Sequence, residues 1–121
     1  MYIIAYRTHF SASHRVQDYP GKCKNLHGHN WKIKVEVKTD QQDEIGISVD
    51  FKELKKIVQP VIEKFDHQYL NDLPFLEGAN PTAENIAQYL YHEIEKKLPE
   101  NVKIHQVIVW ETDKYSIAYR E

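Results

Sequence analysis

The chain has 121 residues, with 16 basic and 18 acidic side chains and a formal charge of −2. This length fits one domain over residues 1–121, which can bury a core without disulfides or metal ions. The balanced charge argues against a nucleic-acid partner, and no apolar stretch reaches the ~20 residues of a membrane-spanning helix. The single cysteine, Cys23, cannot form an internal disulfide, and no signal peptide is evident, so we expect a cytoplasmic location.

Two strands are predicted in the N-terminal third of the chain. Residues 2–14 (YIIAYRTHFSASH) are rich in β-forming residues. Residues 15–26 contain Pro and Gly without periodicity and predict a loop. In residues 27–39 (HGHNWKIKVEVKT) apolar and polar side chains alternate, which predicts a strand with one buried face. His27 and His29 have the phase of that buried face.

An amphipathic helix is predicted after the second strand. Asp50 precedes apolar residues that recur at helical spacing over residues 51–65, and it is the expected N-terminal cap. Pro60 is expected to kink this helix or divide it in two. Residues 66–80 predict an irregular connection.

A second amphipathic helix and two more strands complete the chain. Thr82 is the expected N-cap, apolar residues recur over residues 86–98, and Pro99 lies just beyond the expected end. Residues 103–111 and 114–120 predict strands joined by a short turn.

The order ββααββ predicts an α+β fold, an antiparallel sheet with two helices on one face. Four strands and two helices leave the other face and both edge strands uncovered. Ile3, Ile4 and Ala5 make the first strand too apolar for an edge in water. We therefore expect subunits to join through their sheets.

Three histidines are the main candidates for chemistry. His14 ends the first predicted strand, and His27 and His29 begin the second, so a hairpin can bring all three together. Three neutral imidazoles favour Zn²⁺ with a fourth position open for water or substrate, as in catalytic sites. Structural zinc is less consistent, because Cys23 is the only sulfur ligand available. The alternative is a set of partly buried histidines satisfied by hydrogen bonds.

Other residues could move protons. Cys23 stands between Lys22 and Lys24, whose positive charge favours the reactive thiolate, although an ordinary loop cysteine is the alternative. Asp66 and His67 form an adjacent acid and imidazole, which could orient and carry a proton or could be an ordinary surface pair.

One carboxylate has the phase of an apolar face. Glu111 shares its parity with Val107 and Val109, and a buried carboxylate needs a partner, such as a ligand with adjacent N–H donors. The alternative is a solvent-facing strand end, since the turn begins one residue later.

The segments FSASH, CKNLHGHN, VDF, FDHQYLND, PTAEN and VWET stand in this order over nearly the whole chain. They resemble the 6-pyruvoyl-tetrahydropterin synthase and 6-carboxytetrahydropterin synthase superfamily. The resemblance implies the tunnelling fold (T-fold), in which the sheets of ββααββ subunits join into a barrel and two trimers stack into a homohexamer. It also implies a zinc-dependent lyase that acts on a small-molecule pterin triphosphate.

The resemblance implies roles for the metal ligands and the thiol. His14, His27 and His29 take the place of the zinc ligands, and Cys23 takes that of the catalytic thiol. Two departures lie outside the chemistry: Phe65 stands where the family commonly has Leu, and Ser48 stands where an apolar residue is usual.

The resemblance also implies roles for residues of the second half. Asp66 and His67 take the place of the proton-transfer partners, and Glu111 takes that of the pterin anchor. Thr82 lies in the segment that lines the pterin pocket in the family. Each active site would be shared, with the thiol and zinc histidines from one subunit and Asp66 and His67 from another.

The spacing between Cys23 and His27 distinguishes two branches of the superfamily. Three residues separate them here, a spacing similar to the 6-carboxytetrahydropterin synthases of queuosine biosynthesis, whereas the pyruvoyl enzymes usually have five. The implied reaction converts 7,8-dihydroneopterin triphosphate to 6-carboxy-5,6,7,8-tetrahydropterin, with release of acetaldehyde and triphosphate. The alternatives are a 6-pyruvoyl-tetrahydropterin synthase and a non-catalytic zinc-dependent pterin-binding protein.

Overall fold

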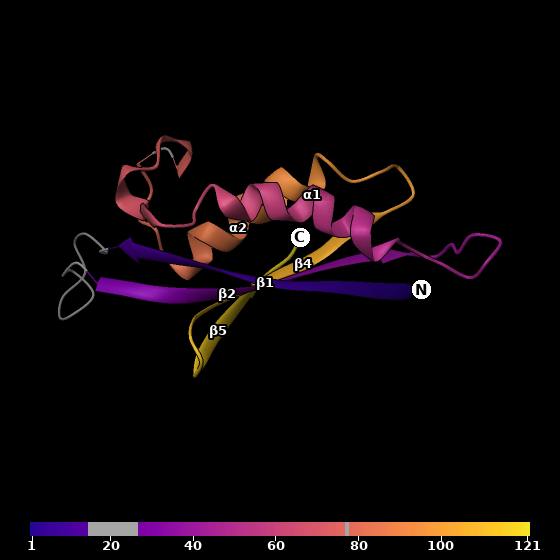
Figure 1. Ribbon diagram of the computed structural model, residues 1–121, viewed down its shortest axis with the longest axis horizontal. Helices are drawn as coiled ribbons and strands as arrows, with labels where there is room; N and C mark the ends of the chain where they lie inside the picture. The colour runs from indigo at the N-terminus through magenta and orange to yellow at the C-terminus, as the bar shows by residue number, and fades with distance from the viewer. Residues whose placement is uncertain (15–26, 77) are drawn as a thin grey trace.

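The computed structural model describes residues 1–14, 27–76 and 78–121, and of His27 the backbone only. Within these ranges five strands form one sheet, and two α-helices lie together on one of its faces (Figure 1). The long strands β1 (Tyr2–His14) and β2 (His27–Thr39) are antiparallel neighbours. Next to β2 follow β4 (Lys103–Thr112) and then β5 (Tyr115–Tyr119), both antiparallel to their neighbours. The predicted α+β fold and the order of its main elements are confirmed.

The connection between the helices is more ordered than the sequence predicts. A two-residue strand, β3 (Gln68–Tyr69), pairs with β1 in parallel, so the sheet order is β3-β1-β2-β4-β5. Two short 3₁₀ helices follow, η2 (Leu70–Asp72) and η3 (Pro74–Leu76). The prediction of an irregular connection is therefore wrong in part, because two residues are too few to show an alternating pattern.

The first helix, α1 (Phe51–Glu63), begins where the sequence predicts. The Asp50 carboxylate accepts a hydrogen bond from the backbone N–H of Lys52 at 2.8 Å. Pro60 lies in the last turn and α1 runs on to Glu63, so the prediction that Pro60 divides the helix is wrong. Pro60 has no N–H to donate to the carbonyl of Lys56, so α1 continues past it with one backbone hydrogen bond fewer.

The second helix, α2 (Ala83–Glu95), also has its predicted cap. The hydroxyl of Thr82 accepts from the backbone N–H of Asn85 at 3.1 Å. The helix ends at Glu95, earlier than the apolar pattern predicts. Among the described residues, neither helix is long and apolar enough to span a bilayer.

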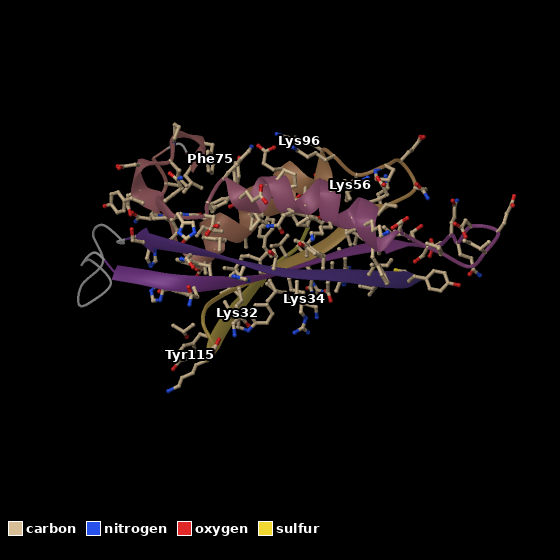
Figure 2. All side chains as sticks on the ribbon, in the orientation of Figure 1. Lys32, Lys34, Lys56, Phe75, Lys96 and Tyr115 are labelled. Carbon is tan, nitrogen blue, oxygen red and sulfur yellow. The ribbon has the colours of Figure 1, made fainter. Side chains whose placement is uncertain are left out.

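The two faces of the sheet differ sharply in character. On the face under the helices, alternate residues of β2 are fully buried, including Trp31, Ile33 and Val35. On the other face, Lys32 and Lys34 point away from the helices (Figure 2). None of the helices within the described ranges covers this second face, as the sequence predicts (Figure 1).

Candidate metal centre and active site

Three side chains from three strands meet on the helix-facing side of the sheet. His14 ends β1, His29 lies near the start of β2, and Glu111 lies near the end of β4. One ligand atom from each residue lies within 4.8 Å of the others. Glu111 Oε1 is 3.0 Å from His29 Nε2 and 3.6 Å from His14 Nε2. The strand pairing produces this convergence, because the hairpin sets His29 opposite Ala12 and so close to His14.

The backbone fixes the orientation of the His14 ring. His14 Nδ1 lies 2.8 Å from the carbonyl oxygen of Pro81, which can only accept a hydrogen bond. The proton of a neutral His14 therefore resides on Nδ1, and the lone pair is on Nε2, which faces Glu111. A histidine held in this way by a carbonyl is typical of metal ligands.

The three side chains differ in the fraction of their surface that is exposed to solvent. The His14 side chain is 1% exposed, that of His29 19% and that of Glu111 32%. Glu111 is therefore not a solvent-facing strand end, since its carboxylate is turned toward two imidazoles. The group is closed on the side of His14 and open on the side of Glu111, so a ligand would enter past the carboxylate.

The donor set fits a zinc ion. Two imidazole nitrogens and a carboxylate oxygen are ligands that Zn²⁺ accepts, and the fixed His14 tautomer leaves the correct nitrogen for coordination. The backbone of His27 pairs with that of His14, as the hairpin argument predicts. The side chain of His27 lies outside the part of the chain that the structure describes.

Asp66 and His67 dock onto the edge of the sheet. The Asp66 carboxylate accepts from the backbone N–H of Ser11 at 3.0 Å, and the His67 N–H donates to the Ser11 carbonyl at 2.6 Å. His67 has a positive φ of 56°, a conformation uncommon for residues other than glycine. Its imidazole is 82% exposed, and Nε2 lies 3.5 Å from Asp66 Oδ2. The pair is thus fixed through the backbone while the imidazole projects outward.

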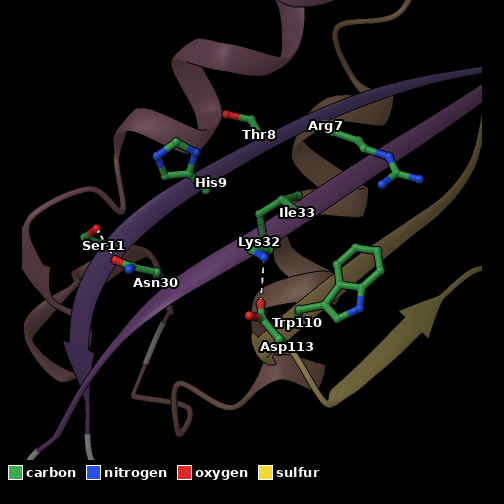
Figure 3. A pocket seen from close by; sticks show the side chains of 9 residues that line it. All are labelled: Arg7, Thr8, His9, Ser11, Asn30, Lys32, Ile33, Trp110 and Asp113. Carbon is green, nitrogen blue, oxygen red and sulfur yellow. Dashed lines mark hydrogen bonds and ion pairs between the residues drawn. The ribbon is translucent and has the colours of Figure 1, made fainter.

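Two hollows of the surface differ in their relation to these residues. The larger, of about 660 Å³, lies on the uncovered face and is lined by Arg7, Lys32 and Trp110 among others (Figure 3). Its described lining includes none of the predicted site residues. A second hollow, of about 550 Å³, is lined by both His29 and His67. Of these two hollows, only the smaller is lined by described residues of the candidate site.

The sequence predicts some residues of the candidate site and does not reveal others. Cys23 lies outside the described residues, and Thr82 caps α2 directly after Pro81. The Pro81 carbonyl was missed, since a backbone oxygen has no signature in the residue type. Trp31, whose ring contacts both His14 and His29, was missed too, although it shares the phase of His29 on β2.

A model of the family described as 6-pyruvoyl tetrahydropterin synthase matches residues 3–121. The chain belongs to this family. A relative from Pyrococcus furiosus, named dihydroneopterin monophosphate aldolase, is 35% identical over 94% of this chain and 93% of its own length. The 6-carboxy-5,6,7,8-tetrahydropterin synthase of Synechocystis is 36% identical over 98% of this chain and 93% of its own.

Solved structures of the family have the same fold. The 6-pyruvoyl tetrahydropterin synthase of Caenorhabditis elegans superposes with a TM-score of 0.87 at 27% identity, over 99% of this chain and 95% of that one. Relatives at similar identity thus have three different names, so membership of the 6-pyruvoyl tetrahydropterin synthase family establishes a pterin-synthase scaffold and leaves the reaction to be argued from the site.

Proposed function

We propose that the protein is a zinc-dependent 6-carboxy-5,6,7,8-tetrahydropterin synthase of queuosine biosynthesis. The observation that carries the proposal is the convergence of His14, His29 and Glu111, with His14 oriented by the Pro81 carbonyl. The substrate would be 7,8-dihydroneopterin triphosphate, and the products would be 6-carboxytetrahydropterin, acetaldehyde and triphosphate. The cytoplasm, where a lone cysteine stays reduced, is the proposed location.

In this proposal His14, His27 and His29 would hold the zinc ion. Glu111, whose carboxylate could also coordinate zinc, would instead face the substrate. A bound Zn²⁺ supplies Lewis acidity, which makes substrate hydroxyls and neighbouring C–H bonds more acidic. Because the His14 side chain is almost fully buried, the protein excludes water on that side, and the substrate side chain would approach from the side of the more exposed His29 and Glu111.

Proton transfer would fall to Cys23, Asp66 and His67. The thiolate of Cys23 removes a proton from the side chain of the substrate, and the imidazole of His67 delivers or accepts one. Asp66 holds the dyad in place through Ser11 and faces the imidazole at 3.5 Å. Because the His67 imidazole projects outward, it could exchange a proton with a substrate that is bound outside the core of its own subunit.

Glu111 would anchor the pterin ring. A carboxylate can accept two parallel hydrogen bonds from the ring N–H and amino group of a pterin. Thr82 would line the same pocket, since its neighbour Pro81 already contacts His14.

The protein would act as a homohexamer, a dimer of trimers whose sheets form a barrel. The uncovered sheet face and the partly unpaired edge strand β1 support this assembly. In the shared-site form of the proposal, Cys23 and the zinc histidines come from one subunit, and Asp66 and His67 come from another.

Mixing two inactive variants tests the shared site. Neither Cys23→Ala nor His67→Ala alone should turn over substrate, but hybrid oligomers reassembled from both should regain partial activity, because some sites carry neither defect. Hybrid hexamers seen by native mass spectrometry without any regained activity would place both residues in one chain's site.

The reaction itself is tested by the products formed from 7,8-dihydroneopterin triphosphate. Mass spectrometry should find 6-carboxytetrahydropterin, and a coupled assay should find acetaldehyde in equal amount. The choice of product rests on the three residues between Cys23 and His27.

Three other outcomes would overturn the proposal in different ways. A 6-pyruvoyl product would indicate triphosphate elimination, and a one-carbon hydroxymethyl product would indicate an aldol cleavage, as the name of the Pyrococcus relative suggests. Tight pterin binding without turnover, unchanged in Cys23→Ala, would indicate a binding protein. The dihydroneopterin monophosphate should be tested beside the triphosphate, so that each outcome can be seen.

A further inference from the structure

Trp31 lies directly behind the candidate metal ligands. Its side chain is 0% exposed and follows His29 on the helix-facing side of β2. The centre of its ring system is 4.8 Å from that of His14 at an interplanar angle of 79°, and 5.7 Å from that of His29 at 83°. One indole therefore contacts both imidazoles edge-to-face at once.

The indole is itself held by other aromatic rings. Phe10, opposite Trp31 on β1, stacks against it at 5.9 Å and 9°, and Phe65 packs against Phe10 at 5.2 Å. All three rings are at most 1% exposed. Closely packed aromatic rings have few alternative rotamers, so Trp31 is a rigid support for the imidazoles.

Local stability does not explain well why a tryptophan occupies position 31. Trp31 Nε1 is buried without a hydrogen-bond partner among the described residues. An unmatched buried donor is costly, and an apolar ring would avoid that cost. What the indole adds over a smaller ring is the width needed to contact His14 and His29 together.

We propose that Trp31 is a positioning residue for the metal ligands His14 and His29. This inference rests on the metal centre of the proposed function. The indole restricts rotation of both rings, so that their Nε2 atoms stay directed toward the space beside Glu111. Loss of a hydrogen-bonding partner of a ligating histidine typically weakens metal affinity about 10–100-fold, and we expect loss of this packing support to fall in the same range.

The principal test compares Trp31→Leu with Phe65→Leu in metal affinity. Zn²⁺ affinity is measured by competition with a chromophoric chelator, and folding is checked by circular dichroism. Both variants remove a buried aromatic ring from the same cluster, but the ring of Phe65 lies one ring farther from the imidazoles and contacts Phe10, Phe75 and Tyr89. Trp31→Leu should lose about 10–100-fold in Zn²⁺ affinity, whereas Phe65→Leu should lose less than about 3-fold.

The outcomes separate this inference from the metal centre itself. Wild-type protein that binds no Zn²⁺ would overturn the metal centre and the inference with it. Wild-type protein that binds Zn²⁺, together with an unchanged affinity in Trp31→Leu or an equal loss in Phe65→Leu, would overturn the positioning role alone.

A second measurement does not depend on the folding of Trp31→Leu. The chain has two tryptophans, so Trp110→Phe leaves Trp31 as the only indole. Paramagnetic Co²⁺ bound beside Trp31 should quench its emission, with saturation at one ion per chain, and the quenching should vanish when His14→Ala is added. Unchanged emission on stoichiometric Co²⁺ binding would show that the indole is not in contact with the ligands of the metal.

Discussion

The two faces of β2 show how one strand serves two purposes. Toward the helices, His29, Trp31 and Ile33 join the core and the candidate metal group. Toward the uncovered side, Lys32 pairs with Asp113 at 2.6 Å in an exposed position, and Figure 3 shows this pair at the rim of the larger hollow. Adjacent residues of β2 thus have different roles, because their side chains point to opposite faces of the sheet.

This difference between the two faces indicates where substitutions should affect stability and chemistry most. The covered face combines rigid packing with polar groups that need fixed partners, so both stability and chemistry depend on it. The uncovered face has solvated charges, whose pairs contribute little to the stability of one chain.

The largest effect is expected from the removal of a metal ligand on the covered face. His14→Ala should abolish stoichiometric Zn²⁺ binding, a loss of more than about 100-fold in affinity, because it removes the ligand with the fixed tautomer. Elemental analysis after zinc repletion measures this effect. The matched control is His9→Ala, which removes an exposed histidine from the uncovered face and should bind zinc normally (Figure 3). Equal metal content in His14→Ala and wild type would contradict the assignment.

A second pair compares the packing of the two faces directly. Ile33→Ala should lower the free energy of unfolding by about 2–5 kcal/mol, because it leaves a cavity at a position that is 1% exposed. Its neighbour Lys32→Ala should change this free energy by less than about 0.5 kcal/mol, since the Lys32–Asp113 pair is exposed. Urea denaturation checks both, and similar losses would show that the uncovered face is packed in solution.

A third variant tests the cap of α2. Thr82→Ala should destabilise the protein by about 1 kcal/mol, because the backbone N–H of Asn85 loses its acceptor. Thr82→Ser keeps the hydroxyl and should remain close to wild type in thermal unfolding. A loss in the serine variant as large as in the alanine variant would point to the methyl group instead of the hydrogen bond.

The smallest effect concerns a carboxylate on the uncovered face. Burial tends to raise the pKa of Glu36, but hydrogen bonds from Gln106 and Lys34 and the charge of Lys34 outweigh it, so the pKa lies below its ordinary value of 4.5. A lowered folded-state pKa stabilises the protein above the unfolded-state value, and this contribution disappears as the pH falls through the folded-state pKa.

The variant Glu36→Gln isolates that contribution. Its melting temperature should be slightly below that of wild type at pH 6–7, and the gap should close on acidification below about pH 4.5. A gap that stays constant or widens toward low pH would contradict the lowered pKa.

Periodic patterns made the main elements predictable from the sequence. The alternation of β2 and the helical spacing of α1 and α2 reflect burial on one side, which the residue types record directly. The two residues of β3 and the continuity of α1 at Pro60 depend on tertiary contacts and helix position, which periodicity does not report.

The alternation of side chains along the strands predicted part of the candidate site. The phases of His29 and Glu111 correctly placed both on the covered face, but phase could not show that their side chains meet at 3.0 Å. Asp66 illustrates the other limit: its adjacency to His67 was visible, whereas its bond to Ser11 depends on β1 passing beside it.

The short path from His14 to α2 connects the metal centre to a helix end. Pro81 accepts from His14, and the next residue, Thr82, caps α2. If the contact with Pro81 increases the affinity of His14 for a ligand, then binding of that ligand must in turn stabilise the ordered first turn of α2. Fraying of that turn would release the imidazole. Metal binding at the centre should therefore slow amide exchange at Asn85, whose backbone N–H donates to Thr82.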